Sequence, residues 1–216
     1  AAAISSLSAG ISIVATRFII FETNPISLAF FRYFIAAVCL LPVLYFGLRR
    51  RNITPKHILP IFILSALLYT LFPWGFSASL KYTTSAYGAI ALSTMPIFTL
   101  IIAYIFGKEE LTKIKIVGVV LAFIGVTIAV SSSWLGETLD KDDLLGIFLM
   151  LAAGMCAAIY SAFSKSFITI YGPLLFTTIS ITIGMLLLSP AAYTLDTFTF
   201  FPRFSEMAWV SLIFLG

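Results

Sequence analysis

The chain has 216 residues, of which 61% are hydrophobic and only 10% are charged. Ordinary soluble domains are about half apolar and about a quarter charged, so this composition excludes an ordinary water-soluble fold. With one histidine and two cysteines, the sequence gives no basis for a histidine-rich metal site or a disulfide framework. The net charge of +4 comes from basic residues in short loops between apolar runs, a distribution that indicates membrane topology and argues against nucleic-acid binding.

Long uncharged runs, each of about 20 residues, predict α-helices that cross a bilayer. The sequence therefore predicts an all-α integral membrane protein, and no signal peptide is expected before the first run. In chain order, the expected spans are 1–20, 25–46, 58–80, 84–106, 113–132, 143–168 and 173–192, with an eighth beginning near the last residue.

Charges in the loops predict the direction of these spans, because basic residues are enriched in cytoplasmic loops. The loops after the second and fourth spans are basic, with Arg49, Arg50, Arg51 and Lys56 in one and Lys108, Lys113 and Lys115 in the other. The loop after the fifth span is acidic, with Glu137, Asp140, Asp142 and Asp143 against one Lys141. All three loops favour a cytoplasmic N-terminus.

An internal repeat emerges when the chain is shifted against itself by 148 positions. The matched pairs are Pro25 with Pro173, Pro42 with Pro190, and Arg17 with Lys165. The shift also lays the first span on the sixth, and both are rich in small and polar residues. Because the repeating unit has an odd number of spans, its second copy is inverted, which is the construction that permits alternating access.

Three segments resemble the EamA family of the drug/metabolite transporter superfamily. They are STMPIFTLIIAYIFGKEELTKIKIVGVVLAFIGVTIAV at 93–131, PISLAFFRYFIAA at 25–37, and AGISIVATR at 9–17, which lacks the usual tryptophan before its glycine. Glu109 matches a glutamate of the family's loop, whereas Glu110 stands where arginine is common. The resemblance implies a ten-helix fold of two inverted five-helix repeats, here truncated to about seven and a half transmembrane helices.

On this basis we expect a first five-helix repeat at 1–132, an extracytoplasmic linker at 133–142, and an incomplete second repeat at 143–216. An offset of 148 plus a unit of about 132 residues implies a parent of about 280 residues.

Polar and aromatic residues on single helix faces predict a path for solute. Hydroxyls in membrane helices also bond to backbone or to adjacent helices, and aromatic residues also pack or form an interfacial belt. Both the solute-path and the structural interpretation of these residues therefore stay open. The predicted substrate-binding residues are Ser12 and Thr16 in the first span, Trp74 and Ser77 in the third, Tyr87 and Thr94 in the fourth, and Tyr160 in the sixth.

Two prolines are predicted hinges. Pro73 and Pro96 deprive the carbonyls of Tyr69 and Leu92 of their helical donors. A kink that neighbouring helices satisfy is the structural alternative.

Three basic residues are predicted to act on solute charge or on gating. Arg17 and Lys165 occupy equivalent repeat positions, so inversion places them near opposite mouths of the path. Snorkelling to the headgroups is the alternative for this pair. Arg32 lies inside the second span, where it serves as a structural anchor or contacts solute.

The predicted function is secondary transport, by export or exchange, of small metabolites such as amino acids, related zwitterions or organic anions. A multidrug cation exporter is one alternative, although no membrane acidic residue is seen to attract a cation. An intramembrane enzyme is the remote one, since no catalytic pair is visible. The expected partners are a small-molecule substrate and the lipid bilayer of a bacterial or archaeal cytoplasmic membrane, with no nucleic acid, metal or cofactor; a homodimer is left open.

Overall fold

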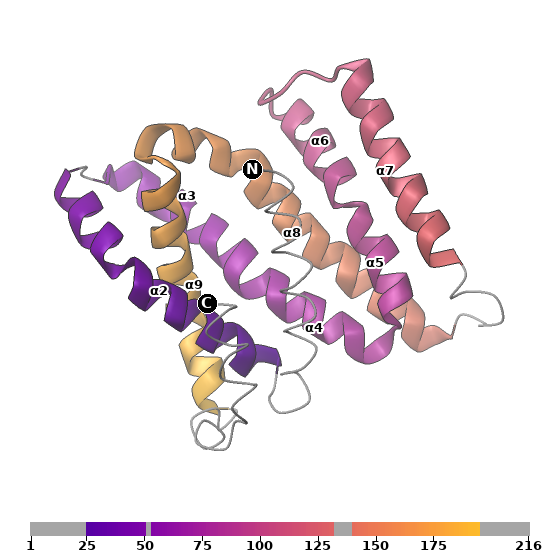
Figure 1. The fold of residues 1–216 in the computed structure, drawn as a ribbon, viewed down its shortest axis with the longest axis horizontal. Coiled ribbons are helices and arrows are strands. Elements are labelled where there is room, and N and C mark those ends of the chain that lie inside the picture. Colours follow the sequence, from indigo (N-terminus) through magenta and orange to yellow (C-terminus); the bar gives the residue numbers. More distant parts are fainter. Residues whose placement is uncertain (1–24, 51–52, 132–139, 195–216) are drawn as a thin grey trace. The chain divides into compact units, whose positions relative to one another are not determined.

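The computed structural model describes residues 25–50, 53–131 and 140–194, and the regular elements within these ranges are helices (Figure 1). The predicted all-α class is confirmed. The predicted first span at 1–20, the linker at 133–142 except its last three residues, and the start of an eighth span lie outside the described residues.

The helices follow the predicted spans closely. They are α2 (Pro25–Arg50), α3 (Pro55–Ala66), the π-helical turn η1 (Leu67–Leu71), α4 (Phe72–Tyr82), α5 (Ser85–Ser93), α6 (Met95–Ile105), α7 (Lys113–Ser131), α8 (Lys141–Tyr171) and α9 (Pro173–Thr194). Among the described residues, five stretches are long and apolar enough to cross a membrane: Ile26–Arg50, Pro55–Tyr82, Ala86–Ile105, Lys141–Tyr171 and Pro173–Thr194. The helix α7 lies where the span at 113–132 was predicted.

Proline marks the start of three helices. Pro25, Pro55 and Pro173 are the first residues of α2, α3 and α9. Proline suits this position because its fixed φ is already helical and its missing N–H has no partner in the first turn.

The third and fourth spans are interrupted directly before Pro73 and Pro96. In the third span the Phe72 N–H bonds to the carbonyl of Leu67, five residues earlier, so one π-helical turn precedes Pro73. In the fourth span Thr94 separates α5 from α6, and Pro96 is the second residue of α6. These interruptions sit where proline removes a helical donor.

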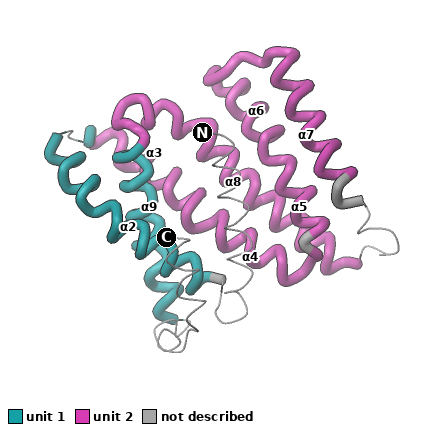
Figure 2. The backbone as a smooth tube through the Cα atoms, viewed as in Figure 1, with its two compact units in different colours: residues 1–54, 174–216 teal, residues 55–173 magenta. Residues whose placement is uncertain are grey.

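The chain divides into two compact units, residues 1–54 with 174–216 and residues 55–173 (Figure 2). In the first unit, α2 packs against α9. Phe31, near the start of α2, shares a core with Leu188, near the end of α9, while Gly47 at the other end of α2 lies against Leu175. The two helices therefore run antiparallel.

In the second unit, α8 packs against α3, η1, α4, α5 and α6. Small residues permit close approach along α4 and α8, since a Cβ on Gly75 would lie 3.2 Å from the Ala153 Cβ. The approach is also close near the start of α8. A Cβ on Gly146 would lie 2.6 Å from the Cβ of Thr83, the residue that follows α4.

Hydrogen bonds fix the start of α8. Asp140 and Asp143 form a capping box, in which each side chain accepts a backbone N–H of the first turn. The second oxygen of Asp143 accepts the Thr83 hydroxyl at 3.0 Å, which ties the turn between α4 and α5 to this end of α8. Two acidic residues of the predicted outer loop therefore have a structural role.

Candidate functional site

A cavity of about 470 Å³ lies between α6, α7 and α8 in the second unit. Its walls are largely apolar and include Met95 and Leu100 of α6, Val119 of α7 and Ala162 of α8. Its charged lining groups are Glu109, Lys115 and Lys165. We call this space the Glu109 cavity; its volume is within the range of pockets that bind small molecules.

The end of α6 places Glu109 at this cavity. Gly107 has a φ of 62°, a left-handed conformation that glycine adopts without a Cβ penalty. The Lys108 N–H bonds to the Ala103 carbonyl at 2.7 Å and the Gly107 N–H bonds to the Tyr104 carbonyl at 2.9 Å. This is a Schellman helix end. It turns the chain sharply, and the Glu109 N–H also reaches the Ala103 carbonyl, at 3.2 Å.

Aromatic contacts hold the same turn against α8. The Phe106 and Phe163 rings meet edge to face, with centroids 5.0 Å apart. The Lys108 ammonium lies 5.9 Å from the Phe163 centroid, at the limit of a cation–π contact. The position of Glu109 thus depends on packing as well as on the helix end.

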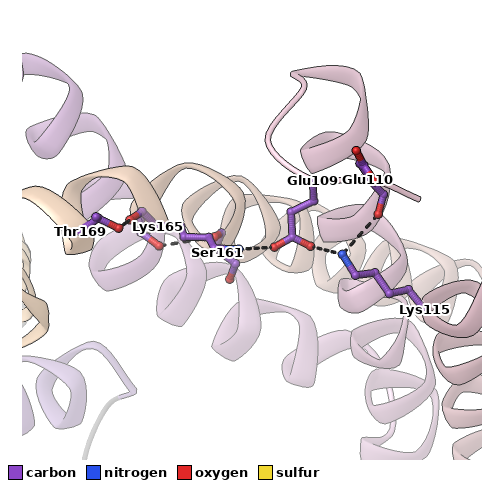
Figure 3. A network of polar contacts seen from close by, with 7 residues as sticks. Glu109, Glu110, Lys115, Ser161, Lys165 and Thr169 are labelled. Atoms are coloured by element: carbon purple, nitrogen blue, oxygen red, sulfur yellow. Dashed lines mark hydrogen bonds and ion pairs between the residues drawn. The ribbon is translucent and has the colours of Figure 1, made fainter. Parts of the chain in front are cut away.

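The Glu109 carboxylate bridges two lysines from different helices (Figure 3). Its Oε1 accepts a hydrogen bond from Lys165 Nζ on α8 at 2.7 Å, and its Oε2 accepts one from Lys115 Nζ on α7 at 2.9 Å. Lys115 also donates to the Glu110 carbonyl at 3.3 Å. The three charged groups carry a net charge of +1.

These bonds change the acidity of Glu109. The hydrogen bond from Lys165, then that from Lys115, and the positive charge of both lower the pKa of Glu109 from 4.5 to about 2. The carboxylate therefore stays ionised throughout the physiological range of pH. The side chain of Lys165 is 70% exposed, so solvent screens the pair, and its contribution to stability is small.

Of the predicted functional residues, Lys165 and Pro96 line the Glu109 cavity. Lys165 was predicted to gate or to attract solute, and it is placed at the charged end. The cavity lining does not include Trp74, Ser77, Tyr87, Thr94 or Tyr160.

The predicted aromatic residues lie at different positions along the helices of the second unit. Tyr160 is buried on α8, with its ring 5.9 Å from that of Tyr69. Tyr87 is buried on α5, and the neighbouring Gly88 lies against Met150 of α8. Met150 comes ten residues before Tyr160, so the two positions are about 15 Å apart along α8. Trp74 is 51% exposed on α4.

Several membrane hydroxyls bond to their own helices. Thr94 donates to the Ala91 carbonyl at 2.6 Å, Ser161 to Ala157 at 2.9 Å, and Thr99 to Met95 at 2.9 Å. Such bonds satisfy a hydroxyl away from water. Ser77 is half-buried on α4.

The remaining predicted residues lie in other parts of the chain. Ser12, Thr16 and Arg17 fall outside the described residues. Arg32 is exposed on α2, in the first unit.

The sequence did not single out Glu109 or Lys115 as site residues. Glu109 entered only as a match to a family glutamate, and Lys115 only as a topology signal. Glu109 and Lys165 lie 56 positions apart, so no local spacing indicates their contact. Gly107 is a sequence signal for the end of α6, and that helix end positions Glu109.

The two ends of α8 differ in charge. Thr83 and Asp143 meet near its start, whereas Glu109 meets Lys165 in its second half. Near its last residue, the Tyr171 hydroxyl lies 2.8 Å from His57 Nδ1, at the start of α3. Asp143 and Lys165 are 22 residues apart, roughly 33 Å along a helix, which is close to the thickness of a bilayer's hydrocarbon core.

Apolar helices of membrane length, with charged groups at their ends, define a multi-pass integral membrane protein of the all-α class. The chain belongs to the EamA-like transporter family, whose model matches residues 1–131. This confirms the family that the sequence resembled.

The chain is similar to curated relatives from archaea, bacteria and plants. It is 28% identical to an uncharacterized transporter of Archaeoglobus fulgidus, over 84% of this chain and 62% of the relative. It is 28% identical to the uncharacterized transporter YyaM of Bacillus subtilis, over 83% of this chain and 59% of the relative. A WAT1-related protein of Arabidopsis thaliana is 33% identical over 50% of this chain and 29% of its own length.

The chain spans about three fifths of the length of the first two relatives. No solved structure matches it.

Proposed function

We propose that the full-length protein is a secondary transporter that exports or exchanges small metabolites, such as amino acids, related zwitterions or organic anions. It works by alternating access of two inverted five-helix repeats in a bacterial or archaeal cytoplasmic membrane. The family and the names of the relatives support transport, and the choice of solute follows from the charges and polar faces of this chain.

The observation that carries inversion is the pairing of α2 with α9. Pro25 and Pro173, which the offset of 148 matches, are the first residues of these helices. Pro42 and Pro190, also matched, both lie inside them. Two equivalent helices that run antiparallel are what a two-fold axis in the membrane plane generates.

The interruptions at Pro73 and Pro96 support their proposed role as hinges. A π-helical turn and a one-residue break leave backbone groups without regular helical partners. These are the places where a membrane helix bends at least cost. Two successive spans that bend could open and close a path between the repeats.

The proposed solute path includes Trp74, Tyr87 and Tyr160, with Arg17, Arg32 and Lys165 acting on charge. Aromatic faces suit the apolar part of a solute, and basic groups suit a carboxylate. Transport that persists after simultaneous replacement of Trp74, Tyr87 and Tyr160 by alanine would reject this path. Tyr104→Ala is the matched control, because Tyr104 is 55% exposed on α6 and lies outside the proposed path.

The test of the function is solute exchange in proteoliposomes that contain the full-length protein. The panel holds amino acids, organic anions and organic cations of similar size. Exchange of amino acids or organic anions is the expected result. Exchange of cations alone would instead favour multidrug efflux and reject the proposed substrate class.

A further inference from the structure

The Glu109 cavity, which shares Lys165 with the proposed solute path, combines an apolar interior with one charged end. Met95, Leu100, Val119 and Ala162 contribute apolar surface, while the lysines approach from α7 and α8. A ligand that fits both features has an apolar part and a single anionic group. Its chemistry is that of a small amphipathic carboxylate.

The charged end already holds an anion of that kind. Glu109 is a carboxylate supplied by the chain itself, and its two oxygens occupy one N–H of Lys165 and one of Lys115. An ammonium group has three donors, and the side chains of Lys165 and Lys115 are 70% and 42% exposed. A carboxylate from solution can therefore reach both lysines.

Exchange of one carboxylate for another is electrostatically balanced. Two ammonium groups and one carboxylate carry a net charge of +1 both before and after the exchange. Because Glu109 sits on a loop, it can move away while the lysines keep their positions on helices.

We propose that the Glu109 cavity binds a small amphipathic monocarboxylate, with its carboxylate on Lys165 and Lys115 in place of Glu109 and its apolar part between α6 and α7. The site lies toward the end of the second unit that carries the basic loop between α6 and α7. As a vestibule for transported solute it rests on the proposed function, but its binding is measurable without transport.

Gly118 supplies a way to test the apolar half alone. It lines the cavity, and a Cβ added there would meet no atom of the described residues within 4 Å. Gly125 lies two turns further along α7 and is not among the lining residues. In the part of the chain that the structure describes, no atom lies within 4 Å of a Cβ added there either. Leucine at 118 fills the cavity, whereas leucine at 125 is the matched control.

The experiment is calorimetric titration of the full-length protein in detergent with hexanoate at pH 7. Hexanamide and hexylammonium, which keep the tail but remove or invert the charge, are the comparison ligands. We expect hexanoate to bind and the other two not to bind. Equal binding of all three would overturn the proposal, since the lysines would then select nothing.

Four variants separate the roles of the charged groups. Lys165→Gln should weaken hexanoate binding about fivefold, the limit for an exposed ion pair, while Lys165→Arg and the control Lys113→Gln should retain it. Glu109→Gln should strengthen binding by about two- to fivefold, because the competing anion is gone. Weaker binding in Glu109→Gln would overturn the exchange, because it would make Glu109 a supporting group.

The cavity variants complete the test. Gly118→Leu should abolish hexanoate binding and Gly125→Leu should leave it unchanged; equal effects of the two would overturn the placement of the tail. Hexanoate binding without solute exchange in proteoliposomes would reject the transport function and keep the site. Solute exchange without hexanoate binding would reject the site and keep the function.

Discussion

Glu109 is an acidic residue whose charge is maintained by two lysines that the chain brings from other helices. Its pKa of about 2 lies below the ordinary value of 4.5, so the folded state favours the ionised form. Its contribution to stability is complete above about pH 4.5 and is lost as the pH falls through about 2. The pair therefore stays intact under physiological conditions.

Replacement of Glu109 by glutamine should lower the melting temperature by a few degrees at most at pH 7, because exposed ion pairs contribute little. Thermal unfolding of the purified protein from pH 7 to pH 2 measures the difference from wild type. The difference should be constant down to about pH 5 and should disappear near pH 2.

Glu110→Gln is the matched control, since it removes a neighbouring charge while its backbone carbonyl still accepts Lys115. It should unfold like wild type at each pH. A loss in Glu109→Gln that persists unchanged at pH 2 would contradict the assigned pKa.

At this scale the sequence predicted residue types better than partners. Lys165 was identified from its place in the repeat, and the structure puts it at a charged cavity. Its partner Glu109 could not be found, because their contact depends on how α6 and its following loop pack on α8. Burial of Tyr87 and Tyr160 likewise depends on packing, which periodicity alone does not specify.

At the scale of elements, hydrophobicity and proline predicted most helix positions. Helices α2 and α9 begin at the predicted residues, 25 and 173, because their runs start at proline. The sequence did not predict the π-helical turn at Leu67–Leu71, although Pro73 indicated where the regular pattern would fail. The turn contacts α8, a helix that is distant from it in the sequence.

Two glycines on α7 lie in an open environment. Gly118 and Gly125 are seven residues apart on α7, a spacing of small residues that is typical of a close helix contact. Within the described residues, no atom lies within 4 Å of a Cβ added to either of them. Close approach occurs instead at Gly75 and Gly146, where α4 and the turn that follows it meet α8.

Alanine at Gly146 and at Gly118 should therefore have opposite effects. The new methyl at 146 would lie 2.6 Å from the Thr83 Cβ and 2.9 Å from its backbone nitrogen, so we expect a loss of about 1–3 kcal/mol. At 118 the methyl meets open space, and helix propensity should stabilise the protein by up to about 1 kcal/mol. Unfolding of both variants by denaturant in detergent measures this. Equal losses would contradict the packing at Thr83.

At the scale of the whole molecule, the antiparallel pairing of α2 with α9 can be tested by cross-linking. In the full-length protein with Cys39 and Cys156 replaced by alanine, cysteines at 47 and 175 should form a disulfide on mild oxidation. Leu175 packs directly against the Gly47 position, which is within reach of a disulfide after small movements.

Cysteines at 47 and 188 provide the matched control. In an antiparallel pair Leu188 packs near Phe31, at the other end of α2 from Gly47, so this pair should stay reduced. A disulfide between 47 and 188 with none between 47 and 175 would mean that the helices run parallel. That result would contradict the inversion on which alternating access rests.

The charges at the two ends of α8 predict the orientation of the molecule in its membrane. Lys113 is the first residue of α7 and follows the loop that carries Glu109. Asp142 lies in the first turn of α8, about a bilayer's thickness along α8 from Lys165. Basic loops face the cytoplasm, so cysteine at 113 should react with a membrane-impermeant maleimide only after cells are permeabilised, and cysteine at 142 should react in intact cells. The reverse pattern would place the basic loops and the Glu109 cavity outside, where hexanoate would be a solute to import.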